Sequence, residues 1–235
     1  GDLPAIDHEK SFVSATPHAN GTFTVTYEVT VNNSGAAAGS YDLTDIPGFD
    51  DDVTINSASY ASDAAGNAGG ALAGTGPWTL ADDQTIGANS THTYTLTVNV
   101  SISITDGQGD DDYTACGETN GTPQAGEGLY NMTELDLTND GTPEQTDDAC
   151  GDLPAIDHEK SFVSATPNAN GTFTVTYEVT VNNSGAAAGA YDLTDIPSFD
   201  DDVTINSASY ASDASGNAGG ALAGTGPWTL TDDQT

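Results

Sequence analysis

Two segments of the chain alternate strictly between apolar and polar residues. In residues 22–31 (TFTVTYEVTV) the apolar positions run from Phe23 to Val31, and in residues 92–104 (HTYTLTVNVSISI) they run from Tyr94 to Ile104. Because successive side chains of a strand point to opposite faces, this period of two predicts half-buried β-strands. Both segments are rich in Thr, Val, Ile and Tyr, residues that favour strands.

Weaker strand patterns and turn residues fill the rest of the first 150 residues. Turn-forming pairs such as Asn20-Gly21 and Pro47-Gly48 separate these patterns, and no segment shows the 3.6-residue period of a helix. Several short strands with one large apolar anchor, Trp78, predict an all-β fold, an Ig-like β-sandwich. The weaker strands are expected at residues 9–14, 40–46, 53–60, 77–80 and 128–137.

The chain repeats itself with a period of 150 residues. Residues 1–85 and 151–235 align without a gap and differ at five positions: His18/Asn168, Ser40/Ala190, Gly48/Ser198, Ala65/Ser215 and Ala81/Thr231. We therefore expect a complete module at 1–150 and the start of a second, truncated module at 151–235, tandem copies of one sandwich in a longer polymer. The segment 151–157 (GDLPAID), which contains Pro154, is expected to be a short, stiff linker.

The charge of the chain is strongly one-sided. Asp and Glu number 36, whereas the only cations are Lys10 and Lys160, which gives a formal net charge of −34. Such a surface repels nucleic acid and anionic membranes, and no apolar run is long enough to span a membrane, so neither is an expected partner. Such a surface attracts divalent cations or the ions of a salty medium.

Two cysteines in the complete module, Cys116 and Cys150, lie outside any zinc-binding pattern. A disulfide between them is therefore expected, which indicates an extracellular protein, and two free buried thiols are the alternative. Closing a loop of this length contributes about 3–4 kcal/mol of stability on the chain-entropy estimate.

Eight Asn-x-Ser/Thr sequons agree with an exported, glycosylated chain, although a sequence rich in Asn and Thr produces many by chance. They lie at Asn20, Asn32, Asn89, Asn99, Asn120, Asn131, Asn170 and Asn182.

One long stretch of the module resembles a known repeat family. The residues EKSFVSATPHANGTFTVTYEVTVNNSGAAAGSYDLTDIPGF, with a Lys in the first strand, a Tyr-containing strand ending in a Val-Asn-Asn-Ser-Gly turn and then Leu-Thr-Asp, resemble the DUF11-type Ig-like repeat of bacterial and archaeal surface proteins. The later block from Cys116 to Cys150 is similar to versions with a cysteine pair closing the last hairpin. The resemblance implies extracellular stalks, adhesins and filaments and no catalytic activity. The long Asp-rich insertion and the scarcity of positive charge depart from the family pattern.

Several acidic clusters are candidate calcium sites, because Ca²⁺ takes six to eight oxygen ligands on flexible loops. The segment 106–112 (DGQGDDD) offers Asp106, Asp110 and Asp112, and a solvated acidic loop is the alternative interpretation. Asp147 and Asp148, beside the acids of the expected linker, are a second candidate pair. The clusters at 50–52 and 136–144 are more simply a solvated surface and a hairpin turn.

Lys10, the only cation of its module, suggests a more specific hypothesis. Surface Ig-like domains sometimes cross-link such a lysine to an Asn of a late strand through an isopeptide bond, assisted by a buried acid. Here the expected partner is Asn131, with Asp45 or Glu28 as the proton shuttle. The reaction needs a neutral amine, and burial lowers a lysine pKa. A plain ion pair of Lys10 is the simpler alternative.

These patterns together predict a structural subunit of an extracellular fibre, stalk or cell-surface filament, rigidified by disulfides and Ca²⁺ and associating with copies of itself. An adhesin or glycan-binding surface repeat is the alternative, and an envelope component of a salt-adapted cell is a third. An enzyme is not expected: no nucleophile elbow, phosphate-binding loop or HExxH motif is present, and His18 is replaced by Asn168 in the second copy. Whether modules also exchange strands between chains is left open by the sequence.

Overall fold

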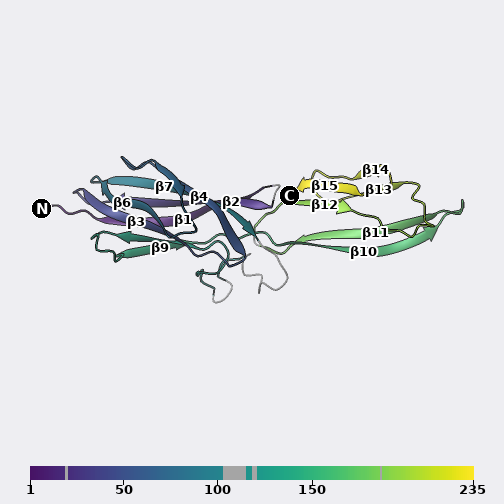
Figure 1. Ribbon diagram of the computed structural model, residues 1–235, viewed down its shortest axis with the longest axis horizontal. Helices are drawn as coiled ribbons and strands as arrows, with labels where there is room; N and C mark the ends of the chain where they lie inside the picture. The colour runs from purple at the N-terminus through teal and green to yellow at the C-terminus, as the bar shows by residue number, and fades with distance from the viewer. Residues whose placement is uncertain (19–20, 103–114, 118–120, 186) are drawn as a thin grey trace. The chain divides into compact units, whose positions relative to one another are not determined.

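The computed structural model describes residues 1–18, 21–102, 115–117, 121–185 and 187–235, and the chain divides into two compact units. Unit 1 contains Gly1–Pro154, and unit 2 contains Ala155–Ser184 and Ala188–Thr235. Every regular element in the described residues is a β-strand (Figure 1), as the alternating pattern predicted. The described residues contain no helix long and apolar enough to cross a membrane.

Unit 1 is a two-layered antiparallel β-sandwich, which confirms the predicted fold class. One sheet has the strand order β1-β2-β7-β4-β5 and the other β6-β3-β8-β9. The strands are β1 (Ile6–Pro17), β2 (Thr22–Asn33), β3 (Gly39–Pro47), β4 (Val53–Ser62), β5 (Gly69–Leu72), β6 (Trp78–Ile86), β7 (Ser90–Ile102), β8 (Asn131–Asp136) and β9 (Gln145–Ala149).

The core of unit 1 is formed by the apolar faces of the strongly alternating strands. β2 and β7 pair side by side within the five-stranded sheet, and the apolar residues at the middle of each strand, such as Val25 and Val98, are fully buried. The opposite sheet contributes Leu43, Leu80 and Leu135. Because each sheet presents one apolar face, the two faces can be removed from water only by packing on one another.

Residues Gly151–Leu153 belong to unit 1 and close its core. Leu153 is fully buried, and the Gly151 carbonyl accepts a hydrogen bond of 3.0 Å from the Leu129 backbone N–H. A β-carbon at Gly151 would lie 2.1 Å from Cε2 of Phe12, so this packing requires glycine. The segment expected to be a linker is therefore largely part of the first sandwich.

The next residues belong to unit 2. The backbone N–H of Ala155 donates to Oδ1 of Asn183 at 3.0 Å, as that of Ala5 donates to Oδ1 of Asn33 in unit 1. Only Pro154 separates the residue that closes the first sandwich from the residue that opens the second. Unit 1 thus extends past Cys150, where the first module was expected to end.

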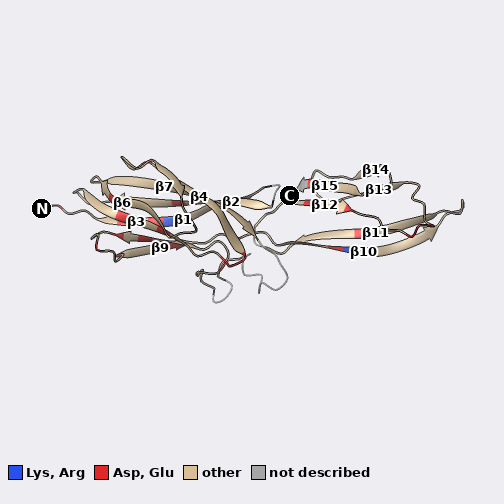
Figure 2. Cartoon of the chain, viewed as in Figure 1, with Lys and Arg blue, Asp and Glu red and all other residues tan. Residues whose placement is uncertain are grey.

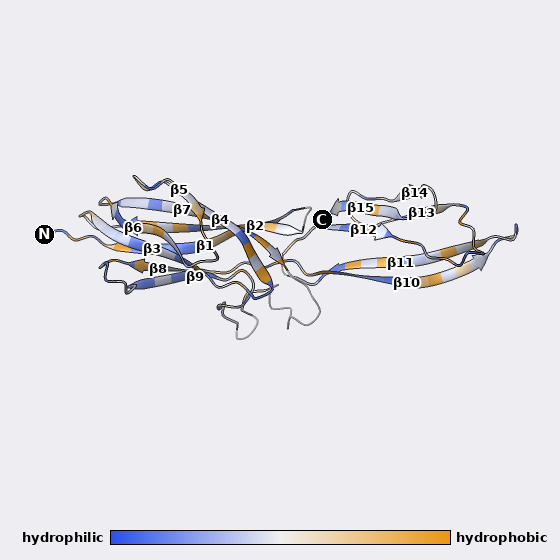
Figure 3. Ribbon diagram, in the orientation of Figure 1, coloured by the Kyte–Doolittle hydropathy of each residue, from blue (hydrophilic) through white to orange (hydrophobic). Residues whose placement is uncertain are grey.

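Unit 2 repeats the strands that its sequence contains. They are β10 (Ile156–Pro167), β11 (Phe173–Asn183), β12 (Tyr191–Asp195), β13 (Ala208–Tyr210), β14 (Gly220–Leu222) and β15 (Trp228–Gln234). β10 and β11 pair in the register of β1 and β2, including the bulge after Phe162, and hydrophobic bands alternate along β11 (Figure 3).

The sheets of unit 2 are fragments because residues 151–235 contain no counterpart of residues 86–150. In unit 1, β7 lies between β2 and β4, and β8 pairs with β3. Without these strands unit 2 forms three separate two-stranded sheets. Apolar side chains are consequently exposed, with 61% of Phe162 and 65% of Phe173 accessible.

Candidate functional site

The single lysine of unit 1 is buried between the two sheets. Lys10 lies on β1, on the same inward face as Ile6, and its side chain is fully inaccessible to solvent. Its Nζ donates a hydrogen bond to Oδ2 of Asp45, whose side chain is equally inaccessible. Figure 2 shows the cation of β1 among the widespread acidic residues. An ion pair inside the core costs much desolvation free energy, so its presence there needs a chemical reason.

Asn131 is brought to the same place by the pairing of β3 with β8. Asp45 pairs with Thr133, and Pro47 pairs with Asn131, so Asn131 is the diagonal neighbour of Asp45 on the inner face. Asn131 is fully buried. Three strands from both sheets therefore place an amine, a carboxyl and a primary amide in one buried cluster, which we call the Lys–Asp–Asn cluster (Lys10, Asp45 and Asn131).

The ring of Tyr27, which contacts two other aromatic rings, lies beside the amine of this cluster. Nζ of Lys10 lies 5.1 Å from the centroid of the Tyr27 ring. Phe12 packs edge-on against Tyr27 with ring centroids 5.7 Å apart, and Phe49 stacks at 6.4 Å. The Tyr27 hydroxyl donates to the backbone carbonyl of Leu129. The Lys10 side chain is inaccessible to solvent, and the Tyr27 ring is part of its buried surroundings.

Several polar atoms of the cluster have no hydrogen-bond partner in the part of the chain that the structure describes. They are Oδ1 of Asp45 and both side-chain amide atoms of Asn131. The Asn131 amide is near enough to lower the pKa of Asp45, yet it does not adopt hydrogen-bond geometry. Buried polar groups are almost always paired, so these atoms call for an explanation.

Burial shifts the proton balance of the pair toward neutral groups. Desolvation lowers the pKa of Lys10, and the charges of Asp45 and Asp147 oppose this shift. Desolvation also raises the pKa of Asp45, with Lys10 opposing. The cluster is therefore suited to hold a neutral amine beside a protonated carboxyl.

Side-chain hydrogen bonds join β1 to the strands of the opposite sheet beside the cluster. Asp147 Oδ2 accepts from the backbone N–H of Lys10 at 2.6 Å, and Gln145 Nε2 donates to the Ile6 carbonyl at 3.0 Å. His8 Nε2 lies 3.1 Å from Oγ1 of Thr133. Together these bonds hold the edge strand β1 against β8 and β9, which fixes the position of Lys10.

The second candidate acid for this site, Glu28, does not reach it. Glu28 lies on β2 with an exposed side chain, on the face opposite to the buried Tyr27 and Val29. Asp45 is therefore the acid that the fold places beside Lys10.

Unit 2 contains the same lysine without the amide. Lys160 Nζ lies 2.7 Å from Oδ1 of Asp195, and these side chains are 38% and 18% exposed. No residue of the sequence corresponds to Asn131 in the second copy.

The two cysteines form the expected disulfide. Cys116 and Cys150 are bonded, with their Cα atoms 5.9 Å apart, and no described cysteine is free. The backbone N–H of Cys116 also donates to Oδ1 of Asp152 at 3.0 Å. The disulfide therefore holds the Cys116 segment beside the residues that close the core.

The predicted metal ligands are only partly placed. Asp106, Asp110 and Asp112 lie outside the described residues. Asp147 and Asp148 are consecutive in β9, so their side chains point to opposite faces and do not converge on one ion. The fold does not support a metal site formed by that pair.

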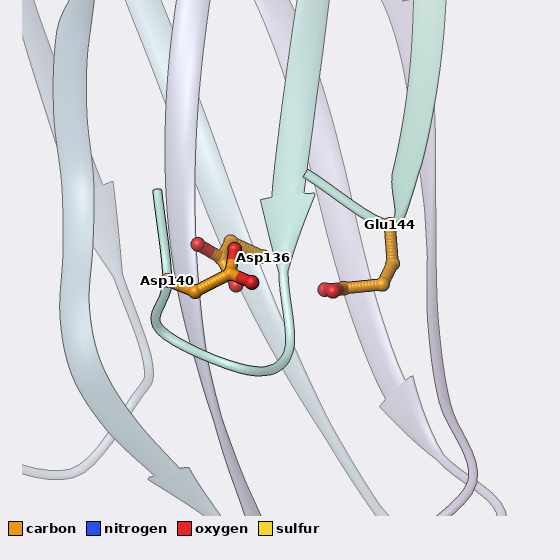
Figure 4. Close-up of side chains that lie close together, drawn as sticks. All are labelled: Asp136, Asp140 and Glu144. Carbon is orange, nitrogen blue, oxygen red and sulfur yellow. The ribbon is translucent and has the colours of Figure 1, made fainter. Parts of the chain in front are cut away.

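Another acidic group forms at the turn after β8. Asp136, Asp140 and Glu144 have ligand atoms within 4.8 Å of one another (Figure 4). Asp136, however, accepts hydrogen bonds from the backbone N–H groups of Thr138, Asn139 and Gly141. These bonds are those of a tight turn, and the segment joins β8 to β9 as a hairpin.

The sequons differ in accessibility. Asn131 is fully buried, so a glycan on this residue would not fit the folded module. Asn20 and Asn120 lie outside the described residues, whereas Asn89, Asn170 and Asn182 are exposed and Asn32 and Asn99 are half-buried. The structure leaves these five sites sterically open to modification to different degrees.

No protein-family model matches the sequence, and no curated protein matches it. Among solved structures, the chain is similar to the major pilin subunit BcpA of Bacillus cereus, at a TM-score of 0.29 and 10% identity, over 90% of this chain and 61% of that one. It is also similar to a GH20 exo-β-N-acetylglucosaminidase of Vibrio harveyi, at a TM-score of 0.23 and 14% identity, over 69% of this chain and 20% of that one. The chain spans less than two thirds of either protein, and likeness at this level carries no functional argument.

Proposed function

We propose that this chain is part of a structural subunit of an extracellular fibre, stalk or cell-surface filament built from tandem 150-residue sandwiches. The observation that carries the proposal is the direct succession of near-identical modules. Leu153 closes one sandwich, Ala155 opens the next, and only Pro154 stands between them. Repeats joined without a long linker are typical of repeat proteins in which each added module extends the molecule along one direction.

The internal links of the module support a mechanical role. The Cys116–Cys150 disulfide and the buried Lys–Asp–Asn cluster both connect segments that are distant in sequence. A disulfide persists in an oxidising compartment, which agrees with an extracellular location. The acidic surface keeps such modules soluble and disfavours binding to nucleic acid and to anionic membranes. The partners we propose are adjacent modules, other copies of this chain and attached glycans.

The adhesin alternative receives less support. Trp78, which is one of the largest aromatic residues of the module, is only 3% exposed, and its Nε1 donates to the Ala73 carbonyl at 3.0 Å. A buried ring of this kind stabilises the core and offers no stacking platform for a sugar. We also propose no enzymatic role, because the buried cluster is enclosed and has no access for a substrate.

Calcium is a further part of the proposal. It rests on the excess of 36 acidic residues over two cations and on the Asp-rich segment 106–112. Bound cations would reduce the repulsion among the carboxylates and stiffen the modules.

Electron microscopy of the material released from producing cells tests the fibre proposal. We expect unbranched filaments whose reconstructed density repeats along the axis and fits unit 1 at every repeat. Compact, separate particles that each contain a ligand-lined cleft would contradict it. Binding of the isolated chain on a glycan array, with no filaments in the same preparation, would favour the adhesin alternative.

A further inference from the structure

We propose that Lys10 and Asn131 become joined by an amide bond between Nζ and Cγ, formed within the folded module with Asp45 as the proton carrier. The observation behind this proposal is that the Lys–Asp–Asn cluster has all three reacting groups in the core, on strands β1, β3 and β8. The bond would connect the two sheets of the proposed fibre module covalently. Its formation can be tested whether or not the chain assembles into fibres.

The unpartnered amide of Asn131 is the first argument. A buried Asn normally has its two donors and two acceptor sites largely satisfied, since each unmade hydrogen bond inside a protein costs free energy. Here neither Oδ1 nor Nδ2 has a partner in the described residues. Such an arrangement is costly as a final state, but it suits an amide that is consumed in a reaction and whose nitrogen departs.

The surroundings of the amine are the second argument. An ammonium group is not a nucleophile, and the complete burial of the Lys10 side chain between the sheets disfavours its charge. Transfer of its proton to Asp45 leaves a neutral amine and a neutral carboxyl in a dry site. Because the fold holds the groups together, the reaction is intramolecular and gains from proximity.

The bonds that form and break in this reaction balance without any further reagent. The Nζ lone pair attacks Cγ of Asn131, and the Cγ–Nδ2 bond then breaks. Asp45 gives its proton to the departing nitrogen, which leaves as one ammonia, and takes up the proton that Nζ releases, so Asp45 ends protonated as it began. The products are one Lys–Asn amide and one ammonia, and nothing is oxidised or reduced.

The bond would connect the two sheets of the sandwich. β1 is an edge strand of the five-stranded sheet, whereas β8 belongs to the four-stranded sheet. The ring closed from residue 10 to residue 131 overlaps the ring closed by the Cys116–Cys150 disulfide. Pulling on the ends of the module would then load covalent bonds before it could separate the sheets.

Unit 2 supplies a control within the same molecule. Lys160 has its acid, Asp195, but the sequence holds no counterpart of Asn131, and the pair is partly exposed. The 235-residue chain is therefore expected to lose one ammonia and not two.

Intact mass spectrometry of the denatured, unreduced full chain tests the proposal. We expect the wild-type mass to be lower than the value calculated for the disulfide-bonded chain by one ammonia, and proteolysis to give a branched peptide that links residues 10 and 131. Lys10→Arg, Asn131→Ala and Asp45→Asn are each expected to restore the full calculated mass. A wild-type chain at its full calculated mass would overturn the proposal, whether or not it forms fibres.

Matched variants separate the reaction from misfolding. Lys160→Arg in unit 2 and Glu28→Gln on the exposed face of β2 are expected to keep the loss of ammonia. If Asp45→Asn keeps the wild-type circular dichroism spectrum and also keeps the ammonia loss, the role of Asp45 is refuted. If that variant does not fold, the mass and branched peptide of the wild-type chain still decide whether the bond exists.

Discussion

Leu153 is fully buried in unit 1, whereas Leu3, the same position of the repeat, has 78% of its surface exposed. The two residues share an identical local sequence, GDLPAIDHEK, but only Leu153 follows the strands of a sandwich, β1 to β9, on which it can pack. The closing segment of a module is therefore supplied by the residues that begin the next sequence repeat.

Leu153→Ala is expected to destabilise unit 1 by about 2–5 kcal/mol, because it leaves a cavity in a closed core. Val13→Ala removes apolar atoms from a position of unit 1 that is 56% exposed and is expected to change stability by less than about 0.5 kcal/mol. Urea unfolding of the two variants, followed by near-ultraviolet circular dichroism, measures the difference. Equal effects would show that Gly151–Leu153 does not close the module.

Gly151→Ala tests the same segment by overpacking. The new β-carbon would lie 2.1 Å from Cε2 of Phe12, so the ring or the chain must move, at a cost of about 1–3 kcal/mol. Gly70→Ala is the matched control in unit 1, since nothing lies within 4 Å of a β-carbon there. Thermal unfolding should show a lower Tm for the first variant only. An unchanged Tm for Gly151→Ala would contradict the contact with Phe12.

Acid is expected to weaken unit 1 partly through His8. Desolvation lowers the pKa of His8, and also that of His92, so each binds a proton less readily in the folded than in the unfolded chain. Their contribution to stability is complete above the unfolded pKa of about 6.5 and is lost as the pH falls toward the lower folded value. The free energy of unfolding should therefore decrease between about pH 7.5 and 5.5.

His8→Gln should make this pH dependence shallower, whatever its effect on stability at neutral pH. The matched variant is His158→Gln, whose histidine is exposed in unit 2, and it should leave the slope unchanged. Denaturant titrations at several pH values give the slopes. A His8→Gln variant with the wild-type slope would exclude His8 as a source of the acid sensitivity.

Chelation tests the calcium proposal. A cation that binds only the folded state stabilises it by about 2.7 kcal/mol at a hundredfold excess over its Kd, so its removal by EDTA should lower the Tm. Adding back Ca²⁺ should restore the Tm, and a chain with Asp110→Asn and Asp112→Asn should not respond. An identical Tm with and without chelator would end the calcium proposal.

The fold was predictable where the alternation of residues is strong. β2 and β7 extend over the segments whose apolar positions alternate, and their buried residues are those of the predicted apolar faces. β5 and β9 were missed, because Gly69–Leu72 contains two glycines and Gln145–Ala149 has no large apolar residue. Both are edge strands, which are defined by pairing with a neighbour more than by their own composition.

The candidate site was predictable in its residue types and less so in its geometry. A lone lysine and an Asn of a late strand pointed to the pair Lys10 and Asn131, and period two already placed Glu28 on the polar face of its strand. Sequence reasoning did not reveal that Phe12 and Phe49 pack against Tyr27, whose ring lies beside the amine, since these contacts join separate segments. Nor could it locate the module boundary, because a periodic sequence has no intrinsic starting point.

The burial of Asn131 also bears on the order of events during export. Attachment of a sugar to this sequon would use the same side-chain nitrogen that the proposed cross-link expels. A glycan added before the chain folds would both occupy that atom and prevent β8 from packing against β3. Rapid folding would shield the residue, so competition between folding and a glycosylating enzyme would decide whether a newly made repeat can form the proposed cross-link.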